Sequence, residues 1–131
     1  MNAKMEKKLI IYTDGGARGN PGSAAIGVVV GDKMYGERIE DTTNNVAEYS
    51  AVIEALCFLR DHNLSSKEVL FVLDSELIVR QITGVYKVKQ SHLLELKNQV
   101  LKVKLLMTMT MMQMMMMKIM MIMMIDVVLI L

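Results

Sequence analysis

Residues 9–22 read LIIYTDGGARGNPG, an apolar, β-branched run that stops at Asp14 and is followed by glycines, an asparagine and a proline. The run Leu9–Thr13 predicts a strand, and the mixture of glycine, asparagine and proline predicts a tight loop over residues 15–22. An acidic side chain that directly follows a strand lies at the end of that strand. Asp14 is therefore the first candidate functional residue.

Two further strands are expected downstream of this stretch. Ala24–Val30 is apolar and ends at Gly31-Asp32, and Lys33–Glu40 alternates in polarity. A Gly-Asp pair between two such runs is typical of a hairpin. The first three strands are therefore predicted to form an antiparallel meander.

The next two elements predict a helix and then a parallel strand. Asp41–Asn45 is a cluster of capping residues, and apolar residues recur at three- and four-residue steps from Val46 to Leu59, as in an amphipathic helix. Val69–Leu73 is continuously apolar, as expected for a strand buried on both faces, and is bounded by Asp74. A helix followed by a strand indicates a parallel crossover, so we expect an α/β fold.

A short helix is predicted over Ser75–Ile82, ending before Gly84, and another from Ser91 to about Lys104. With 131 residues, the chain is about one domain long, so residues 1–131 are expected to form a single domain. The ordinary globular pattern lasts only to about residue 104.

The segment 105–131 is dominated by methionine, with 12 of the chain's 15 methionines between Met107 and Met124. Methionine specifies packing poorly. Alternation over residues 107–111 permits a last strand followed by a helix. About 20 apolar residues would also suffice to span a membrane, although polar residues interrupt this segment. The third alternative is an altered C-terminus, such as one from a shifted reading frame.

Composition limits the classes of function. The net charge of +1 gives no large basic field, so nucleic-acid binding would depend on local charge and bound metal. The single cysteine, Cys57, excludes an intramolecular disulfide. The lysine-rich start, Met1–Lys8, and the stop at Asp14 do not fit a signal peptide. We expect a cytoplasmic protein without a membrane partner.

Asp14 and Asp74 each follow an apolar run. If these strands are parallel neighbours, about 4.8 Å apart, their carboxylates lie side by side. Such a pair is tolerated when one acid is protonated or a hard cation bridges them, and Mg²⁺ prefers oxygen ligands. Glu48, one turn into the predicted helix, could reach the same edge. The three acids are thus a candidate metal site.

Each acid also has a purely structural interpretation. Asp14 could close the Asp-Gly turn. Glu48 stands three residues after Asn45, the spacing of a capping box. Asp74 could cap the helix that follows it. These alternatives do not explain why all three acids fall near one sheet edge.

Four blocks in order, YTDGGARGNPG (12–22), TTNNVAE (42–48), LDSE (73–76) and YKVK (86–89), resemble the ribonuclease H type 1 family, in particular its compact bacterial and archaeal members. The resemblance covers about residues 8–104. It implies a ribonuclease H-like α/β fold: a five-stranded mixed sheet, with three antiparallel strands and then parallel ones, flanked by helices. Residues 105–131 would supply the last strand and helix.

The resemblance also implies a function: endonucleolytic hydrolysis of the RNA strand of RNA·DNA hybrids, giving 5′-phosphate and 3′-hydroxyl ends. The cofactor would be two Mg²⁺ ions, for which Mn²⁺ could substitute, and no small-molecule cofactor is expected. Asp14, Glu48 and Asp74 match the family's metal ligands. Substrate contacts are implied for five positions: Gly15, Asn20, Thr43, Asn44 and Asn45.

The family pattern fails in the methionine-rich segment. Asp126 lies 52 residues after Asp74, close to the spacing of the family's fourth catalytic and metal-binding aspartate. The histidine that the family places before it is missing, because His62 and His92 stand elsewhere. An impaired hybrid-binding module is therefore the alternative to an active enzyme, and a monomer is expected in either case.

Overall fold

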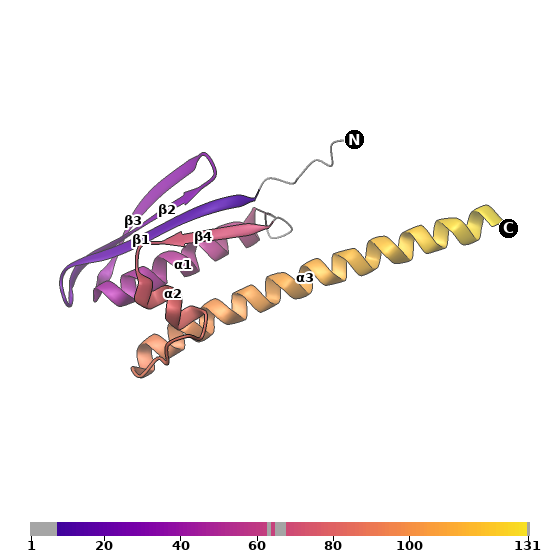
Figure 1. Ribbon diagram of the computed structural model, residues 1–131. Coiled ribbons are helices and arrows are strands. Elements are labelled where there is room, and N and C mark those ends of the chain that lie inside the picture. Colours follow the sequence, from indigo (N-terminus) through magenta and orange to yellow (C-terminus); the bar gives the residue numbers. More distant parts are fainter. Residues whose placement is uncertain (1–7, 63, 65–67, 131) are drawn as a thin grey trace.

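The computed structural model describes residues 8–62, 64 and 68–130, without the side chains of residues 110, 111 and 125–130 (Figure 1). Apart from Lys8, the lysine-rich start of the chain lies outside these residues. The elements, in order, are β1 (Leu9–Gly19), β2 (Gly22–Val30), β3 (Lys33–Thr42), α1 (Asn44–Asp61), β4 (Val69–Leu73), α2 (Glu76–Ile82) and α3 (Ser91–Ile130).

The strands form one mixed sheet in the order β3-β2-β1-β4. β1 pairs antiparallel with β2, and β2 pairs antiparallel with β3, which confirms the predicted meander. β4 pairs parallel with β1, from Leu9 opposite Val69 to Thr13 opposite Leu73. The helix α1 between β3 and β4 makes the predicted crossover, so the α/β class is confirmed.

The predicted loop over residues 15–22 is wrong in its extent. β1 continues through the glycines to Gly19, which pairs with Gly22, and only Asn20 and Pro21 form the turn. Glycine has little preference for strands, but pairing with a neighbouring strand overrides such local preferences. Gly19 has a φ of +88°, a conformation that favours glycine at this corner.

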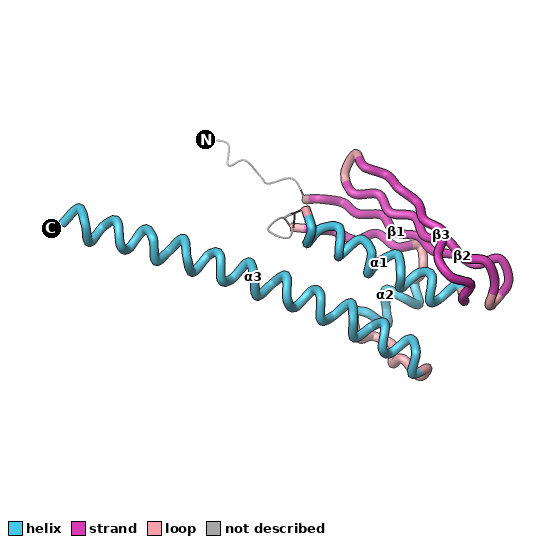
Figure 2. The backbone as a smooth tube through the Cα atoms, turned by 180° about the vertical axis from the view of Figure 1, so that it is seen from behind, coloured by secondary structure: helices cyan, strands magenta, loops and turns pink. Residues whose placement is uncertain are grey.

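The predicted fifth strand is also wrong for this structure, because the described residues contain four strands. Residues 107–111 lie inside α3, a continuous helix from Ser91 to Ile130 (Figure 2). Methionine is a good helix former, and no glycine or proline interrupts residues 91–130. A five-residue alternation is a weak signal against 40 residues without a helix breaker.

The core lies between the sheet and the helices, which Figures 1 and 2 place on one side of the sheet. Ile11 and Val28 point into it from the strands, while Leu93 and Val100 enter from the first turns of α3. From α1 come Tyr49, Val52, Ala55, Leu56 and Leu59. Each large side chain buried in this way contributes roughly 1.5–3 kcal/mol.

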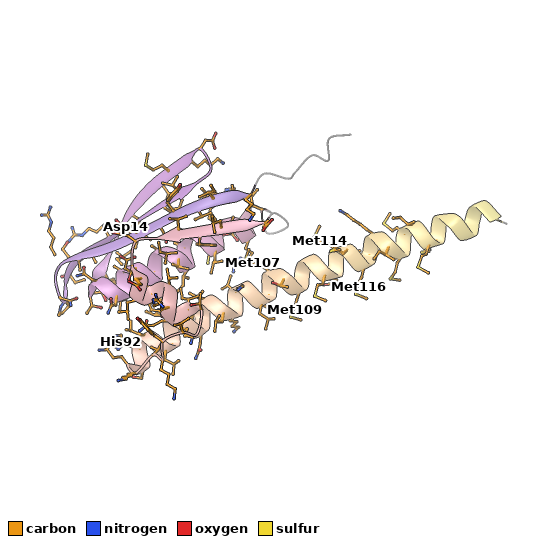
Figure 3. The ribbon with its side chains drawn as sticks, in the orientation of Figure 1. Asp14, His92, Met107, Met109, Met114 and Met116 are labelled. Atoms are coloured by element: carbon orange, nitrogen blue, oxygen red, sulfur yellow. The ribbon has the colours of Figure 1, made fainter. Side chains whose placement is uncertain are left out.

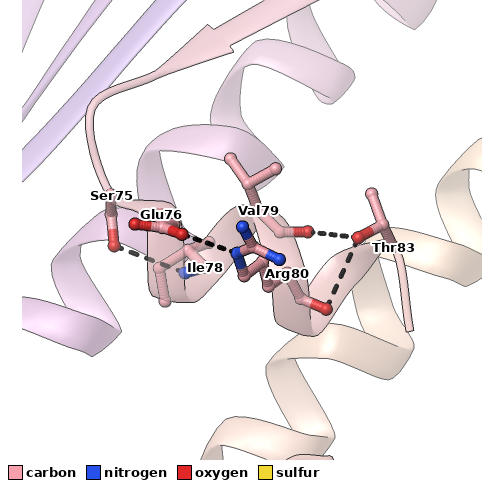
Figure 4. Close-up of polar contacts among 6 residues, drawn as sticks. All are labelled: Ser75, Glu76, Ile78, Val79, Arg80 and Thr83. Atoms are coloured by element: carbon pink, nitrogen blue, oxygen red, sulfur yellow. Dashed lines mark hydrogen bonds and ion pairs between the residues drawn. The ribbon is translucent and has the colours of Figure 1, made fainter. Parts of the chain in front are cut away.

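α2 is a short helix with defined ends (Figure 4). The hydroxyl of Ser75 accepts a hydrogen bond from the backbone N–H of Ile78 at 3.3 Å, and Arg80 forms an ion pair with Glu76 at 2.7 Å. At the other end, the Thr83 hydroxyl donates to the carbonyl of Val79 at 2.8 Å. Gly84, with φ +84°, follows, so the predicted end is confirmed.

α2 is tied to α1 by one buried hydrogen bond. The Tyr49 hydroxyl donates to Oε1 of Gln81 at 2.8 Å, and both side chains are buried. Tyr49→Phe should lower the free energy of unfolding by about 1–3 kcal/mol, because the Gln81 oxygen loses its donor while the ring packing is kept. Urea unfolding followed by circular dichroism measures this change.

Tyr12→Phe is the matched control, since the Tyr12 side chain is half exposed. It should change the unfolding free energy by less than about 0.5 kcal/mol. Equal effects of the two substitutions would contradict a special contribution from the Tyr49–Gln81 pair.

Candidate active site

Asp14 and Asp74 lie at adjacent positions on neighbouring strands. The parallel pairing of β1 and β4 ends with Thr13 opposite Leu73, and the two acids are the next residues on each chain segment. Both side chains are exposed, and both line a groove on the face of the sheet away from the helices. Figure 3 shows Asp14 on β1 above the helices. The sequence prediction that these two acids meet at one edge is confirmed.

Glu48 is brought to the same edge by a close contact between β1 and α1. A Cβ atom on Gly15 would lie 2.2 Å from the carbonyl oxygen of Ala47 and 2.6 Å from the backbone nitrogen of Glu48. Only glycine permits this approach without a shift of the backbone. The residue after Asp14 therefore fixes the first turn of α1, which carries Glu48, against the middle of β1, where its pairing with β4 ends.

The pKa of Glu48 is raised to about 7. Partial burial of its carboxyl group is the main cause, and the negative charges of Asp14 and Asp74 add to it. A hydrogen bond from the Gly15 backbone N–H acts in the opposite direction. One carboxyl oxygen, Oε2, is buried without a hydrogen-bond partner among the described residues. The three acids therefore form one electrostatically coupled group.

The structure removes the purely structural interpretations of these acids. The N-cap of α1 is Thr43, whose hydroxyl accepts from the Val46 N–H at 3.3 Å, so Glu48 is not at the capping-box position. Ser75, rather than Asp74, caps α2. Asp14 lies inside β1, opposite Gly27, and not in a turn.

Two of the predicted substrate-binding residues join the β1–β2 hairpin to α1. Oδ1 of Asn44 accepts a hydrogen bond from the Ala17 N–H at 2.7 Å. The backbone N–H of Asn44 donates to Oδ1 of Asn20 at 3.0 Å. Thr43 is engaged as the N-cap. Asn20 and Asn44 thus position the hairpin, and Thr43 fixes the start of α1, whatever other contacts they make.

Asn45 lies beside a surface that the site prediction missed. It lines a groove of about 480 Å³ together with Tyr86, Lys87 and Lys89. The Arg80 guanidinium lies over the ring of Tyr86, with 5.4 Å between Cζ of Arg80 and the ring centre. A Tyr-Lys-x-Lys sequence is a basic, aromatic pattern that could have indicated this surface, but the sequence does not show that it folds next to Asn45.

The structure does not bring the end of α3 to the acidic cluster. α3 carries residue 126 near its C-terminal end, which extends away from the sheet (Figure 1), and the side chain of Asp126 lies outside the described residues. His62, as expected, is elsewhere: it stacks on Phe58 at 3.9 Å at the end of α1.

The donor set fits a cation that keeps part of its water shell. No group of three acid, histidine or cysteine side chains within the described ranges is close enough to enclose an ion. Mg²⁺ seldom needs such a cage, because it commonly uses one or two carboxylates together with water and substrate phosphate oxygens. The Glu48 oxygen without a partner among the described residues, together with Asp14 and Asp74, would supply ligands of this kind.

A mixed sheet with three coupled acids where the parallel pairing of β1 and β4 ends defines an α/β protein with an acidic cluster at that point. The family model for RNase H matches residues 6–124. The chain therefore belongs to the RNase H family.

Several relatives and solved structures support this assignment. A bifunctional protein of Mycobacterium tuberculosis is 40% identical over 96 residues, which are 68% of this chain and 26% of that protein. A ribonuclease H of Clostridium botulinum is 48% identical over 62 residues, 42% of each chain. The chain thus spans about a quarter to two fifths of the length of these relatives.

Among solved structures, LC11-RNase H1 bound to an RNA/DNA hybrid is 50% identical, with a TM-score of 0.71 over 75% of this chain and 77% of that one. RNase H1 of the archaeon Halobacterium salinarum is 33% identical, with a TM-score of 0.69 over 75% of this chain and 77% of that one.

The raised pKa of Glu48 predicts how stability depends on pH without metal. Between its ordinary value of 4.5 and about 7, the folded chain binds more protons at Glu48 than the unfolded chain does. The free energy of unfolding should therefore fall as the pH rises through this window and level off above it. Glu48→Gln should flatten this fall and give a variant more stable than the parent at pH 8.

Urea titrations in EDTA from pH 4 to pH 8 would measure this effect. Glu95→Gln, which removes one exposed acid on α3, controls for the change in net charge. An unchanged slope in Glu48→Gln would contradict the proposed coupling of the three acids.

Proposed function

We propose that the chain hydrolyses the RNA strand of RNA·DNA hybrids endonucleolytically, leaving 5′-phosphate and 3′-hydroxyl ends. The observation that carries this proposal is the coupled group Asp14, Glu48 and Asp74, with one buried Glu48 oxygen that lacks a partner among the described residues. Membership of the RNase H family and a similar structure bound to an RNA/DNA hybrid support the choice of substrate.

The three acids would hold two Mg²⁺ ions, with Mn²⁺ as a substitute. Bound divalent cations would lower the pKa of a water nucleophile and stabilise the charge on the departing 3′ oxygen. Because the pKa of Glu48 is about 7, this group holds a proton part of the time at neutral pH without metal. Ion binding and proton release at Glu48 are therefore expected to be coupled.

The hybrid would be recognised by the hairpin and the start of α1. Amide side chains such as those of Asn20, Asn44 and Asn45 can pair with base edges and with 2′-hydroxyls, which distinguish RNA from DNA. Thr43 would contact a phosphate of the DNA strand. Gly15, next to Asp14, would be a further contact to the substrate. The Asn44 side chain is already held by the Ala17 N–H, and the Asn20 side chain by the Asn44 N–H.

Asp126 is proposed as the fourth catalytic and metal-binding acid, on the basis of its spacing from Asp74. The alternative function, a hybrid-binding module with impaired catalysis, is favoured by one observation: α3 extends away from the acidic cluster (Figure 1). An active enzyme and a binding module would make the same contacts with the hybrid. They would differ only in whether the RNA strand is cleaved. Cleavage and binding must therefore be measured separately.

Asp14→Asn should abolish Mg²⁺-dependent cleavage of a labelled RNA·DNA hybrid while hybrid binding persists, because an amide keeps the shape of the side chain but loses the charge that holds the ion. Asp32→Asn, which changes an exposed aspartate in the β2–β3 turn, is the matched control and should retain activity. A gel assay resolves the products.

In the same assay, Asp126→Asn tests the fourth ligand, and duplex DNA should remain uncut. Equal cleavage in EDTA would rule out the metal-dependent mechanism. Hybrid binding by the parent chain without any cleavage would establish the binding module instead.

Asn45→Ala should weaken hybrid binding by about 1–3 kcal/mol with little loss of stability. The hydrogen bonds between the hairpin and α1 among the described residues are made by Asn20 and Asn44 and not by the Asn45 side chain. Asn44→Ala should lower both binding and stability, since it removes the acceptor of the Ala17 N–H. Fluorescence anisotropy with a labelled hybrid and thermal unfolding separate the two effects. Similar profiles for both variants would contradict the distinct positions of the two side chains.

A further inference from the structure

One face of the sheet exposes a row of apolar side chains that crosses all four strands. Val72 pairs with Tyr12, Tyr12 with Val29, and Val29 with Met34. Tyr12, Met34 and Val72 are between 39% and 79% exposed, as are Ile10 and Leu70 in the neighbouring row. We call Ile10, Tyr12, Met34, Leu70 and Val72 the open sheet face. A groove of about 720 Å³ runs along it and ends at Asp14 and Asp74.

A second apolar surface lies on α3 beyond residue 105. Met114 projects from a different side of the helix than Met109 and Met116 do (Figure 3), and all three are more than half exposed. The same exposure holds for the other described large apolar residues of 112–124. A helix that is apolar all round needs an apolar environment. The surface formed by 109 and 112–124 is called the methionine helix surface.

The methionine helix surface cannot cover the open sheet face of its own chain without a break in α3. Residues 91–130 form one continuous helix without glycine or proline. Both backbone views show this helix running away from the sheet, on the side that carries α1 (Figures 1 and 2). The two apolar surfaces of one molecule therefore lie apart.

We propose that a second copy of the chain covers them: the methionine helix surface of one molecule docks on the open sheet face of another, and the contact is reciprocal. A standard interface uses roughly 20–30 residues from each partner. In a reciprocal dimer each chain contributes twice, through the five residues of its open sheet face and through the side of its methionine helix surface that faces the partner sheet. Methionine adapts its shape to irregular surfaces, which suits packing against a twisted sheet.

A lipid bilayer fits these observations less well. Residues 91–124 of α3 are long and apolar enough to cross a membrane, and the most apolar part of this segment is not buried. A bilayer would cover the helix but leave the open sheet face in water. It would also place Lys118, in the middle of the apolar segment, in hydrocarbon at a cost of roughly 2.5–3.5 kcal/mol.

Light scattering coupled to size-exclusion chromatography tests this proposal on the full chain. The parent chain should have twice the mass of one chain at micromolar concentration. A sheet variant, Met34→Lys/Leu70→Lys, and a helix variant, Met116→Lys/Met123→Lys, should each raise the dimer dissociation constant at least about tenfold, because each buries charge in an apolar contact. Leu94→Lys/Leu101→Lys adds the same charge outside both surfaces and should change it less than about twofold.

Mixing the sheet variant with the helix variant gives a sharper test. The intact helix of the first can dock on the intact sheet of the second, so the mixture should recover dimers that neither variant forms alone. A monomeric parent chain, or dimers that the sheet variant leaves unchanged, would overturn the proposal. Binding to phosphatidylcholine vesicles by the parent and the sheet variant alike would also overturn it, with the bilayer as the partner. Circular dichroism confirms that each variant is folded.

Discussion

The contact between Gly15 on β1 and the first turn of α1 is the constraint on which the site depends. Since any side chain at position 15 would overlap the carbonyl of Ala47, the strand and the helix approach as closely as their backbones allow. Glu48 follows Ala47, and Asp14 precedes Gly15. One backbone contact therefore sets the separation of two acids that lie 34 residues apart in the sequence. The pairing of β1 with β4 brings in the third acid, Asp74.

This arrangement places like charges together at some cost to stability. Burial and the charges of two neighbouring acids raise the pKa of Glu48, and the hydrogen bond from the Gly15 N–H offsets only part of this effect. A protein selected for stability alone would separate these groups. Clusters of acids with perturbed pKa values are typical of functional sites, where the arrangement serves catalysis or binding at the expense of stability.

The sequence predicts the fold correctly where a local hydrophobic pattern agrees with the tertiary packing. The runs before Asp14 and Asp74 predicted two strands, and a parallel pairing was enough to place both acids together. The prediction failed for residues 15–19, because strand pairing with β2 was decided by the partner and not by the local preference of glycine. The groove beside Asn45 could not be predicted either, since its lysines come from residues 87 and 89, beyond α2.

The long α3 and the open sheet face have one physical origin. Methionine supports a helix well but directs its packing weakly, so residues 105–130 extend the helix begun at Ser91 instead of returning to the sheet. Tyr12 and Val72 are exposed, and Figures 1 and 2 show the described helices on only one side of the sheet. Because α3 does not return to the sheet, both the open sheet face and the methionine helix surface are left exposed. The preference of this segment for a continuous helix keeps its apolar side chains away from the sheet of the same molecule. It therefore favours the proposed contact with the sheet of a second molecule.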